Sequence, residues 1–121
     1  FVDIDDFKQL NDKYGHTVGD IVLKELANLI KSSLRDVDIA ARFGGEEFVI
    51  MLPNTNKEGA YSTAKRLQEM LKHTPLAGHI ISASIGIANY TQGLNAKSLI
   101  DRADKAMYKV KKTEKGNIRF F

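Results

Sequence analysis

The segment 39–53 constrains the fold more than any other part of the chain. Alternating apolar residues over 39–43 are followed by the pair Gly44-Gly45 and then by an apolar run over 48–52, which a proline ends. Alternation and short apolar runs predict strands, and a glycine pair between two strands predicts the turn of an antiparallel hairpin. The chain therefore contains at least one antiparallel pair of strands, and an all-helical fold is excluded.

Helical and strand patterns alternate on both sides of this hairpin. Further strands are predicted at 1–4, 81–87 and 118–120, and apolar residues at helical spacing predict helices near 7–14, 17–35, 60–71 and 99–110. The order β-α-α-β-β-α-β-α-β predicts an α+β fold in which helices cover a sheet. With 121 residues, no internal repeat and no linker, the chain is expected to form one domain.

Two short patterns predict where the second and third helices begin. Thr17 stands three residues before Asp20, and Thr55 stands three residues before Glu58. A hydroxyl followed at this spacing by a carboxylate is typical of a capping box, in which the side chains bind free amides of the first helical turn. We therefore expect the second helix to begin just after Thr17 and the third just after Thr55.

The composition narrows the class of protein and of partner. Hydrophobic residues make up 43% and charged residues 27%, as in an ordinary globular domain. No apolar run approaches the roughly 18 residues that a transmembrane helix needs, and the absence of cysteine excludes disulfides and thiolate metal sites. The net charge of +3 suits an anionic ligand such as a nucleotide, but it is too weak to indicate DNA or membrane binding.

Carboxylates stand at the ends of two predicted strands. Asp3 lies within the apolar stretch 1–4, where burial of an unpaired charge is costly, and Glu46 and Glu47 follow the glycine pair. Carboxylates gathered at strand ends form a hard-oxygen site for magnesium, which can neutralise a triphosphate and activate an attacking hydroxyl. From the residues alone, Glu46 and Glu47 also fit polar turn positions, and Asp3 also fits an edge-strand charge or a helix N-cap.

The motif Gly44-Gly-Glu-Glu-Phe48 resembles the signature of the GGDEF domain of bacterial diguanylate cyclases, in its GGEEF form. Three further segments resemble the family's metal- and base-binding stretch, a later strand and the last helix: 3–20, 84–87 and 103–111. The resemblance covers essentially the whole chain. It implies a ferredoxin-like, palm-type antiparallel sheet flanked by helices, as in nucleotidyl cyclase catalytic domains.

The same resemblance has implications for domain boundaries. The family's domain normally begins earlier, with an Asp-x-Leu-Thr segment and an extra helix, so 1–121 is expected to be a GGDEF catalytic domain without its first helix and the start of its first strand. That helix helps to wall the nucleotide pocket, so weak or absent activity is one expectation for this chain. The resemblance also implies a preceding sensor or dimerising domain and a cytoplasmic location for the catalytic domain, even where the parent protein is membrane-anchored.

The resemblance assigns a metal site and catalytic residues. It implies that magnesium, or manganese in its place, binds the carboxylate of Asp3 and the backbone carbonyl of Ile4, with Glu46 as a shared carboxylate ligand. Glu47 is implied to complete the acidic cluster at the metal and to help the 3′-hydroxyl of the substrate to attack. Glu46 and Glu47 are therefore the expected catalytic residues.

A base-reading pair is implied at Asn11 and Asp20. Guanine's pairing edge offers one acceptor and two donors, so an amide can donate to the acceptor and a carboxylate can accept from both donors. Adenine would place an acceptor opposite that carboxylate, and a buried unpaired polar group rejects such a ligand strongly. Without the resemblance, Asp20 is better explained by the capping pattern with Thr17, and Asn11 as a polar residue on a helix.

Residues that are expected to contact phosphates are spread over three segments: Phe7, Lys8, Gly44, Gly45, Lys111 and Lys115. Free amides at the start of a helix favour phosphate, and glycines let the backbone approach it closely. The family usually shows Gly-Arg/Lys-Asn after the last helix, whereas this chain has Thr113-Glu-Lys-Gly-Asn117, so the spacing of Lys115 departs slightly from the pattern. Other lysines near this helix end are explained as solvated residues that complement the helix dipole.

A second ligand site is implied by Arg35-Asp-Val-Asp38, which lies shortly before the glycine pair. The segment fits the family's RxxD inhibitory site, where the product binds and slows the enzyme. Arginine can stack on a guanine face and fork to N7 and O6 or to phosphate, while aspartate supports it. Arg66 is the implied second arginine of this site. From the residues alone, a polar helix end with a local ion pair explains Arg35 and Asp38 as well.

The resemblance implies a diguanylate cyclase, which condenses two GTP into cyclic di-GMP and two pyrophosphates. The product contains two identical guanylates related by a two-fold axis, so we expect two domains to face each other as a homodimer, each holding one GTP. Three alternatives stay open: a weak or inactive domain that senses GTP or cyclic di-GMP, another palm-like nucleotidyl transferase such as an adenylyl cyclase relative, and a structural interaction domain. The intact motif at 44–48 argues against the first alternative. Asn11 and Asp20 together favour a guanine nucleotide as the substrate.

Overall fold

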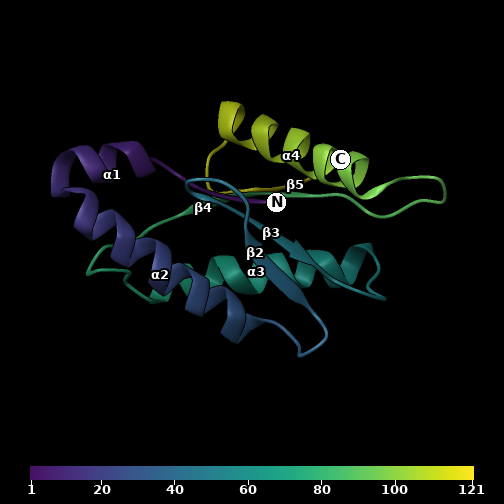
Figure 1. The fold of residues 1–121 in the computed structure, drawn as a ribbon, viewed down its shortest axis with the longest axis horizontal. Coiled ribbons are helices and arrows are strands. Elements are labelled where there is room, and N and C mark those ends of the chain that lie inside the picture. Colours follow the sequence, from purple (N-terminus) through teal and green to yellow (C-terminus); the bar gives the residue numbers. More distant parts are fainter.

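The computed structural model describes residues 1–121, and its elements follow the predicted order (Figure 1). The strands are β1 (Val2–Ile4), β2 (Ile39–Arg42), β3 (Glu47–Met51), β4 (Ala83–Ile87) and β5 (Ile118–Phe120). The helices are α1 (Phe7–Tyr14), α2 (His16–Ser33), α3 (Lys57–His73) and α4 (Ala96–Thr113). None of the helices combines the length and the hydropathy that crossing a membrane requires. The predicted α+β class is confirmed.

The strands form one sheet in the order β2-β3-β1-β4-β5. β2 and β3 make the predicted antiparallel hairpin, and β1 lies antiparallel between β3 and β4. The last strand differs from the predicted antiparallel arrangement, because β5 pairs parallel to β4. The crossover through α4 explains the difference, since a helix between two neighbouring strands lets both run in the same direction. The sheet is therefore mixed.

The two faces of the sheet carry different side chains. α2 and α3 cover one face, and α4 lies across the other (Figure 1). Val2 of β1 belongs to one cluster of buried apolar residues with Leu26 of α2 and Leu67 of α3. Because side chains alternate along a strand, Asp3 next to Val2 points to the opposite face, which α4 covers. The fold thereby places a buried carboxylate beneath α4.

Both predicted capping boxes are wrong. α2 begins at His16, and no side chain caps it. The cap of α3 is Asn56, whose side-chain oxygen accepts a hydrogen bond from the Gly59 amide at 2.9 Å. Thr55 instead donates its hydroxyl to the Pro53 carbonyl oxygen at 2.9 Å. Asparagine caps a helix at least as well as threonine, so the pattern cannot distinguish two neighbouring candidates.

α4 approaches the sheet very closely at one position. A Cβ atom on Gly86 of β4 would lie 2.0 Å from the Ala103 carbonyl oxygen and 2.3 Å from the Met107 amide nitrogen. Only glycine leaves room for the helix backbone there. This contact sets the height of α4 above the sheet, and therefore the place where the end of α4 meets β1.

Candidate functional site

A row of polar side chains crosses the sheet on the face that α4 covers. Asp3 of β1 is paired with Glu47 of β3 on one side and with Ser84 of β4 on the other. The Ile4 amide donates a hydrogen bond to the Glu46 carbonyl oxygen at 3.2 Å, which ties the end of β1 to the glycine turn. The structure therefore brings together the two stretches whose carboxylates the sequence singles out.

Burial and mutual repulsion act on the carboxylates of this row. Burial is the main cause that raises the pKa of Asp3; the charge of Glu46 adds to it, and a hydrogen bond from Lys111 opposes it. The pKa of Glu47 is also raised, first by burial and then by the charges of Asp3 and Asp104. A bound cation would relieve both carboxylates, because it would offset the crowded negative charge.

The ammonium group of Lys111 lies directly against this row. Its Nζ donates to Asp3 Oδ1 at 2.6 Å and to the Ile4 carbonyl oxygen at 2.9 Å. These are the two residues whose oxygens the resemblance assigns to magnesium, and the ammonium is a stand-in cation between them. A carboxylate and a carbonyl oxygen are also the ligands that a hard divalent ion prefers. The residues present therefore fit a divalent metal.

The side chains of Glu46 and Glu47 do not join Asp3 in a preformed cluster. No group of three or more histidine, aspartate or glutamate side chains converges into a metal site. Glu46 lies in the turn before β3, and Glu47 Oε1 folds back against Gly44. Bringing all three carboxylates onto one ion would therefore require these side chains to rotate.

The glycine turn is braced by Arg42, which sequence reasoning missed. Arg42 Nε donates to the carbonyl oxygens of Gly44 and Gly45, each at 3.1 Å. A Cβ on Gly44 would lie 2.4 Å from Glu47 Oε1, whereas one on Gly45 would meet nothing within 4 Å. Gly44 thus leaves room for the Glu47 carboxylate in its present rotamer, and Gly45 leaves an open face beside the turn. The position of an arginine two residues before Gly44 is the signal that points to this role.

A second buried carboxylate, Asp5, ties β1 to its neighbours and was also missed. Asp5 is 7% exposed and accepts hydrogen bonds from the hydroxyls of Ser82 and Ser84, each at 2.6 Å. The Gly116 amide donates to the same Ser84 hydroxyl at 3.2 Å. This network joins the end of β1 to the loop between α4 and β5. The second carboxylate in Asp3-Ile-Asp5 was the available signal.

The residues assigned to guanine lie where α1 packs on α2. Asn11 of α1 is half-buried, and its Oδ1 is buried without a hydrogen-bond partner. A Cβ on Gly19 would lie 1.8 Å from that oxygen, so Gly19 makes room for the Asn11 amide. Asp20 comes next in α2 and is exposed. A buried polar atom without a partner is unusual in a folded protein. Because this oxygen is enclosed where α1 packs on α2, a ligand does not reach it.

The expected phosphate residues lie around the start of α1 and the end of α4. Phe7 and Lys8 are the first residues of α1, and Asp6 before them has a left-handed backbone with φ of 56°. The Lys115 ammonium donates to Asp6 Oδ1 at 2.6 Å. Lys111 and Lys115 are therefore both held by acidic residues at the start of the chain.

Arg35 and Arg66 line one polar cavity of about 500 Å³ at the start of α3. Arg35 Nη2 donates to Asp38 Oδ1 at 2.8 Å and to the Thr55 hydroxyl at 2.9 Å, and its hydrogen bond lowers the pKa of Asp38. Arg66 Nη2 donates to the Ser33 carbonyl oxygen at 2.7 Å. Two guanidinium groups in one open cavity suit an anionic ligand.

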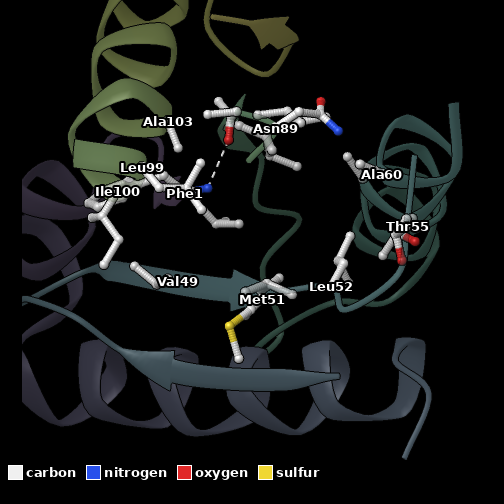
Figure 2. Close-up of a pocket in the computed structure, with 18 of the residues that line it drawn as sticks. Phe1, Val49, Met51, Leu52, Thr55, Ala60, Asn89, Leu99, Ile100 and Ala103 are labelled. Carbon is white, nitrogen blue, oxygen red and sulfur yellow. Dashed lines mark hydrogen bonds between the residues drawn. The ribbon is translucent and has the colours of Figure 1, made fainter. Parts of the chain in front are cut away.

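Another cavity lies between α3, α4 and the sheet, with a volume of about 540 Å³ (Figure 2). Val49 of β3, Leu99 of α4 and Ala60 of α3 lie around it, and none of the side chains that line it is charged. No residue assigned to metal, guanine or phosphate lines it. An uncharged, largely apolar surface does not suit a triphosphate, so the polar row beneath α4 is the better candidate site.

Comparison with known proteins identifies the family of this chain. A family model described as "Diguanylate cyclase, GGDEF domain" matches residues 1–117. Diguanylate cyclase A from Treponema denticola is 44% identical over 97% of this chain and 33% of its own length. The chain thus spans about a third of the length of such curated relatives.

Solved structures share the fold. The active GGEEF domain of a diguanylate cyclase from Vibrio cholerae superposes with a TM-score of 0.91 at 32% identity, over 99% of this chain and 79% of that one. The GGDEF domain of DgcB from Caulobacter crescentus, in complex with c-di-GMP, gives a TM-score of 0.89 at 29% identity, over 98% of this chain and 74% of that one. These likenesses confirm the palm-type α+β fold.

Proposed function

Because this chain belongs to the family of diguanylate cyclase GGDEF domains, we propose that it condenses two molecules of GTP into cyclic di-GMP and two pyrophosphates. The observation that carries the proposal is the position of Asp3 beside the Glu46 turn, with an ammonium group between the Asp3 carboxylate and the Ile4 carbonyl. Oxygen ligands gathered in this way suit a divalent ion and the phosphates of a nucleotide.

Asp3, the Ile4 carbonyl, Glu46 and Glu47 are the proposed ligands of magnesium or manganese. When bound, the ion neutralises triphosphate charge and makes the attacking 3′-hydroxyl more acidic. Glu47 is proposed to help take the proton of this hydroxyl, because it lies opposite Asp3 in the sheet, beside the proposed metal ligands. Gly45 leaves open space beside the turn, which allows a phosphate to approach the backbone.

The other phosphates are proposed to lie between the start of α1 and the end of α4. The free amides of Phe7 and Lys8 favour an anion, and Lys111 and Lys115 supply positive charge. These groups would neutralise the pyrophosphate as it leaves, which lowers the barrier for the bond that breaks.

Catalysis is proposed to need two domains face to face in a homodimer. Each domain has one proposed metal site, at Asp3, Glu46 and Glu47, and one proposed guanine site, at Asn11 and Asp20. The product, however, contains two guanylates related by a two-fold axis. Each 3′-hydroxyl attacks the α-phosphate of the other GTP, so two phosphodiester bonds form and two pyrophosphates leave. An isologous dimer would align both reactions and hold the reacting atoms in place.

Guanine selection is expected to weaken when Asp20 is replaced by alanine. The variant loses the acceptor proposed for the guanine donors, whereas ITP lacks the 2-amino donor in any case. The preference for GTP over ITP, measured as the ratio of kcat/KM values, should therefore fall about tenfold. Asp12→Ala removes the same charge from an exposed position on α1 and should keep the ratio. An unchanged ratio in Asp20→Ala would remove Asp20 from base recognition.

Product inhibition is expected to be relieved when Arg35 is replaced by alanine, while synthesis continues. The guanidinium is proposed to stack on a guanine of cyclic di-GMP or to donate two hydrogen bonds to it. The cyclic di-GMP concentration that halves the rate of synthesis should therefore rise at least about tenfold in the variant. Arg35 is 54% exposed whereas the Asp38 side chain is 2% exposed, so the variant leaves this carboxylate with the hydrogen bond from the backbone amide of residue 35 but without its ion pair. The melting temperature is therefore measured beside the rates, to separate relief of inhibition from a loss of stability. Initial rates at increasing cyclic di-GMP give the measurement. Arg119→Ala, on an exposed residue of β5, is the matched control, and an inhibition curve like that of the control would contradict the proposal.

The activity itself is tested by incubating the purified protein with GTP and magnesium and identifying the products by mass. Two pyrophosphates for each cyclic di-GMP are expected, and ATP should yield no cyclic dinucleotide. A second candidate function, a cyclic di-GMP sensor, is favoured by the polar cavity that Arg35 and Arg66 line. Binding of cyclic di-GMP without any synthesis from GTP would support the sensor and reject the cyclase.

A further inference from the structure

Two ion pairs tie the end of α4 to the start of the chain. Lys111 Nζ donates to Asp3 Oδ1 at 2.6 Å and to the Ile4 carbonyl oxygen at 2.9 Å. Lys115 Nζ donates to Asp6 Oδ1 at 2.6 Å. Both lysines are proposed above to bind phosphate, so in this state neither ammonium is available for that role.

The two pairs differ in how much water reaches them. The side chains of Lys111 and Asp3 are 22% and 11% exposed, whereas those of Lys115 and Asp6 are 51% and 54% exposed. A largely buried, hydrogen-bonded pair competes strongly with other partners, because breaking it leaves a charge without compensation. An exposed pair competes weakly.

We propose that Lys111 is an internal competitor for the divalent cation, and that Asp6 is an internal competitor for the phosphate that Lys115 binds. The inference rests on the proposed function, because it concerns the same metal and phosphate sites. Lys111 occupies the two oxygens at the centre of the metal site, and an ion can take them only after the lysine releases them. Lys111 and Asp6 thereby set the affinity of the empty domain for metal and for triphosphate.

The charges of the site stay balanced when a metal ion replaces Lys111 beside Asp3 and a phosphate replaces Asp3 beside Lys111. While Lys111 is paired with Asp3, its ammonium neutralises this carboxylate, and after exchange the ammonium is free to pair with a phosphate. Lys111 would repel a divalent ion if it stayed between the two oxygens. Metal alone would leave the lysine unpaired, and triphosphate alone would leave Asp3 unpaired. Metal and triphosphate are therefore expected to bind with positive coupling.

The first experiment measures Mn²⁺ binding without nucleotide, by the electron paramagnetic resonance signal of the free ion. Lys111→Met keeps the length of the side chain and removes its charge, and should bind Mn²⁺ about tenfold more tightly than the unmodified protein. Lys112→Met is the matched control, because the Lys112 ammonium lies over the Tyr108 ring rather than in the site. Its affinity should change by no more than about twofold.

Two results of this titration would contradict different claims. Equal Mn²⁺ affinity in Lys111→Met and Lys112→Met would overturn the competition by Lys111 and leave the proposed function standing. No Mn²⁺ binding by any of the three proteins would reject the metal site of the proposed function as well.

A second readout follows the lysine itself and needs no activity. A lysine ammonium held by two acceptors exchanges its protons slowly and gives a resolved ¹H–¹⁵N correlation, which Lys111→Met assigns by its disappearance. Saturating Mg²⁺ should shift or abolish this signal, since the lysine leaves Asp3. A signal that persists unchanged at saturating Mg²⁺ would overturn the exchange.

The proposed competition between Asp6 and phosphate for Lys115 is tested with inorganic tripolyphosphate as the probe. Asp6→Asn keeps a side chain that tolerates the left-handed backbone, and it frees Lys115. By isothermal titration calorimetry the variant should bind tripolyphosphate about threefold more tightly. Asp12→Asn is the control for the lost charge, and an equal gain in both variants would overturn the role of Asp6.

Discussion

Replacing Asp3 by asparagine is expected to lower the rate of cyclic di-GMP synthesis by about three orders of magnitude and to leave the fold intact. The substitution removes the one charged side chain of β1, which faces the proposed ion, and keeps its size and one acceptor oxygen. The fold should tolerate it for two reasons. Burial is the main cause that raises the pKa of Asp3, so folding disfavours its charged form, and the Lys111 ammonium can still donate to the asparagine oxygen and to the Ile4 carbonyl oxygen. That penalty grows as the pH rises above the ordinary pKa of aspartate, and the neutral amide avoids it.

The measurements for Asp3→Asn are the initial rate at saturating GTP and magnesium, and the melting temperature by circular dichroism. Asp12→Asn is the matched control, because it removes the same charge from an exposed site on α1. The control should synthesise product at the rate of the unmodified protein. If Asp3→Asn kept more than about a tenth of that rate, its carboxylate would not be a metal ligand.

Substituting Gly86 by alanine is expected to destabilise the protein by about 3 kcal/mol, which corresponds to roughly 10 °C in melting temperature. The added methyl group would collide with the Ala103 carbonyl oxygen and the Met107 amide nitrogen of α4. Both are backbone atoms and cannot rotate away, so α4 must move off the sheet. Urea unfolding followed by circular dichroism measures the loss.

Gly45→Ala is the control for this prediction. A Cβ on Gly45 would meet nothing within 4 Å, and the residue is not among the glycines with a positive φ. Its melting temperature should therefore stay close to that of the unmodified protein. If Gly86→Ala melted within about 2 °C of Gly45→Ala, the close contact between β4 and α4 would not matter for stability.

The sequence predicted the elements where a pattern depends only on near neighbours. The hairpin around Gly44-Gly45, the end of α1 at Gly15 and the strand at 118–120 are all present. Helix starts were harder to predict, because Thr55 and Asn56 are both acceptable caps and only the folded backbone selects between them. The parallel pairing of β5 with β4 was likewise not encoded in the local pattern of either strand.

The candidate site was predictable in its backbone but not in its side-chain partners. The resemblance implied that Asp3 and the Glu46 turn share a site, and their strands are indeed neighbours in the sheet. The partner of Asp3 is Lys111, 108 positions later. No local pattern encodes a pairing over that distance, since it depends on the height at which Gly86 holds α4. The hydrogen bonds that Asp5 accepts from Ser82 and Ser84 form only when β1 and β4 lie side by side.

The central claim is that oxygens of Asp3, Ile4 and the Glu46 turn hold a divalent ion against the phosphates of a nucleotide. Anomalous diffraction at the manganese edge, from crystals grown with Mn²⁺ and an unreactive GTP analogue, tests it most directly. The predicted result is an anomalous peak roughly 2.0–2.6 Å from the Asp3 carboxylate and the Ile4 carbonyl oxygen, with Lys111 moved onto a phosphate. A peak bound to phosphates alone, with Lys111 still hydrogen-bonded to Asp3, would contradict it.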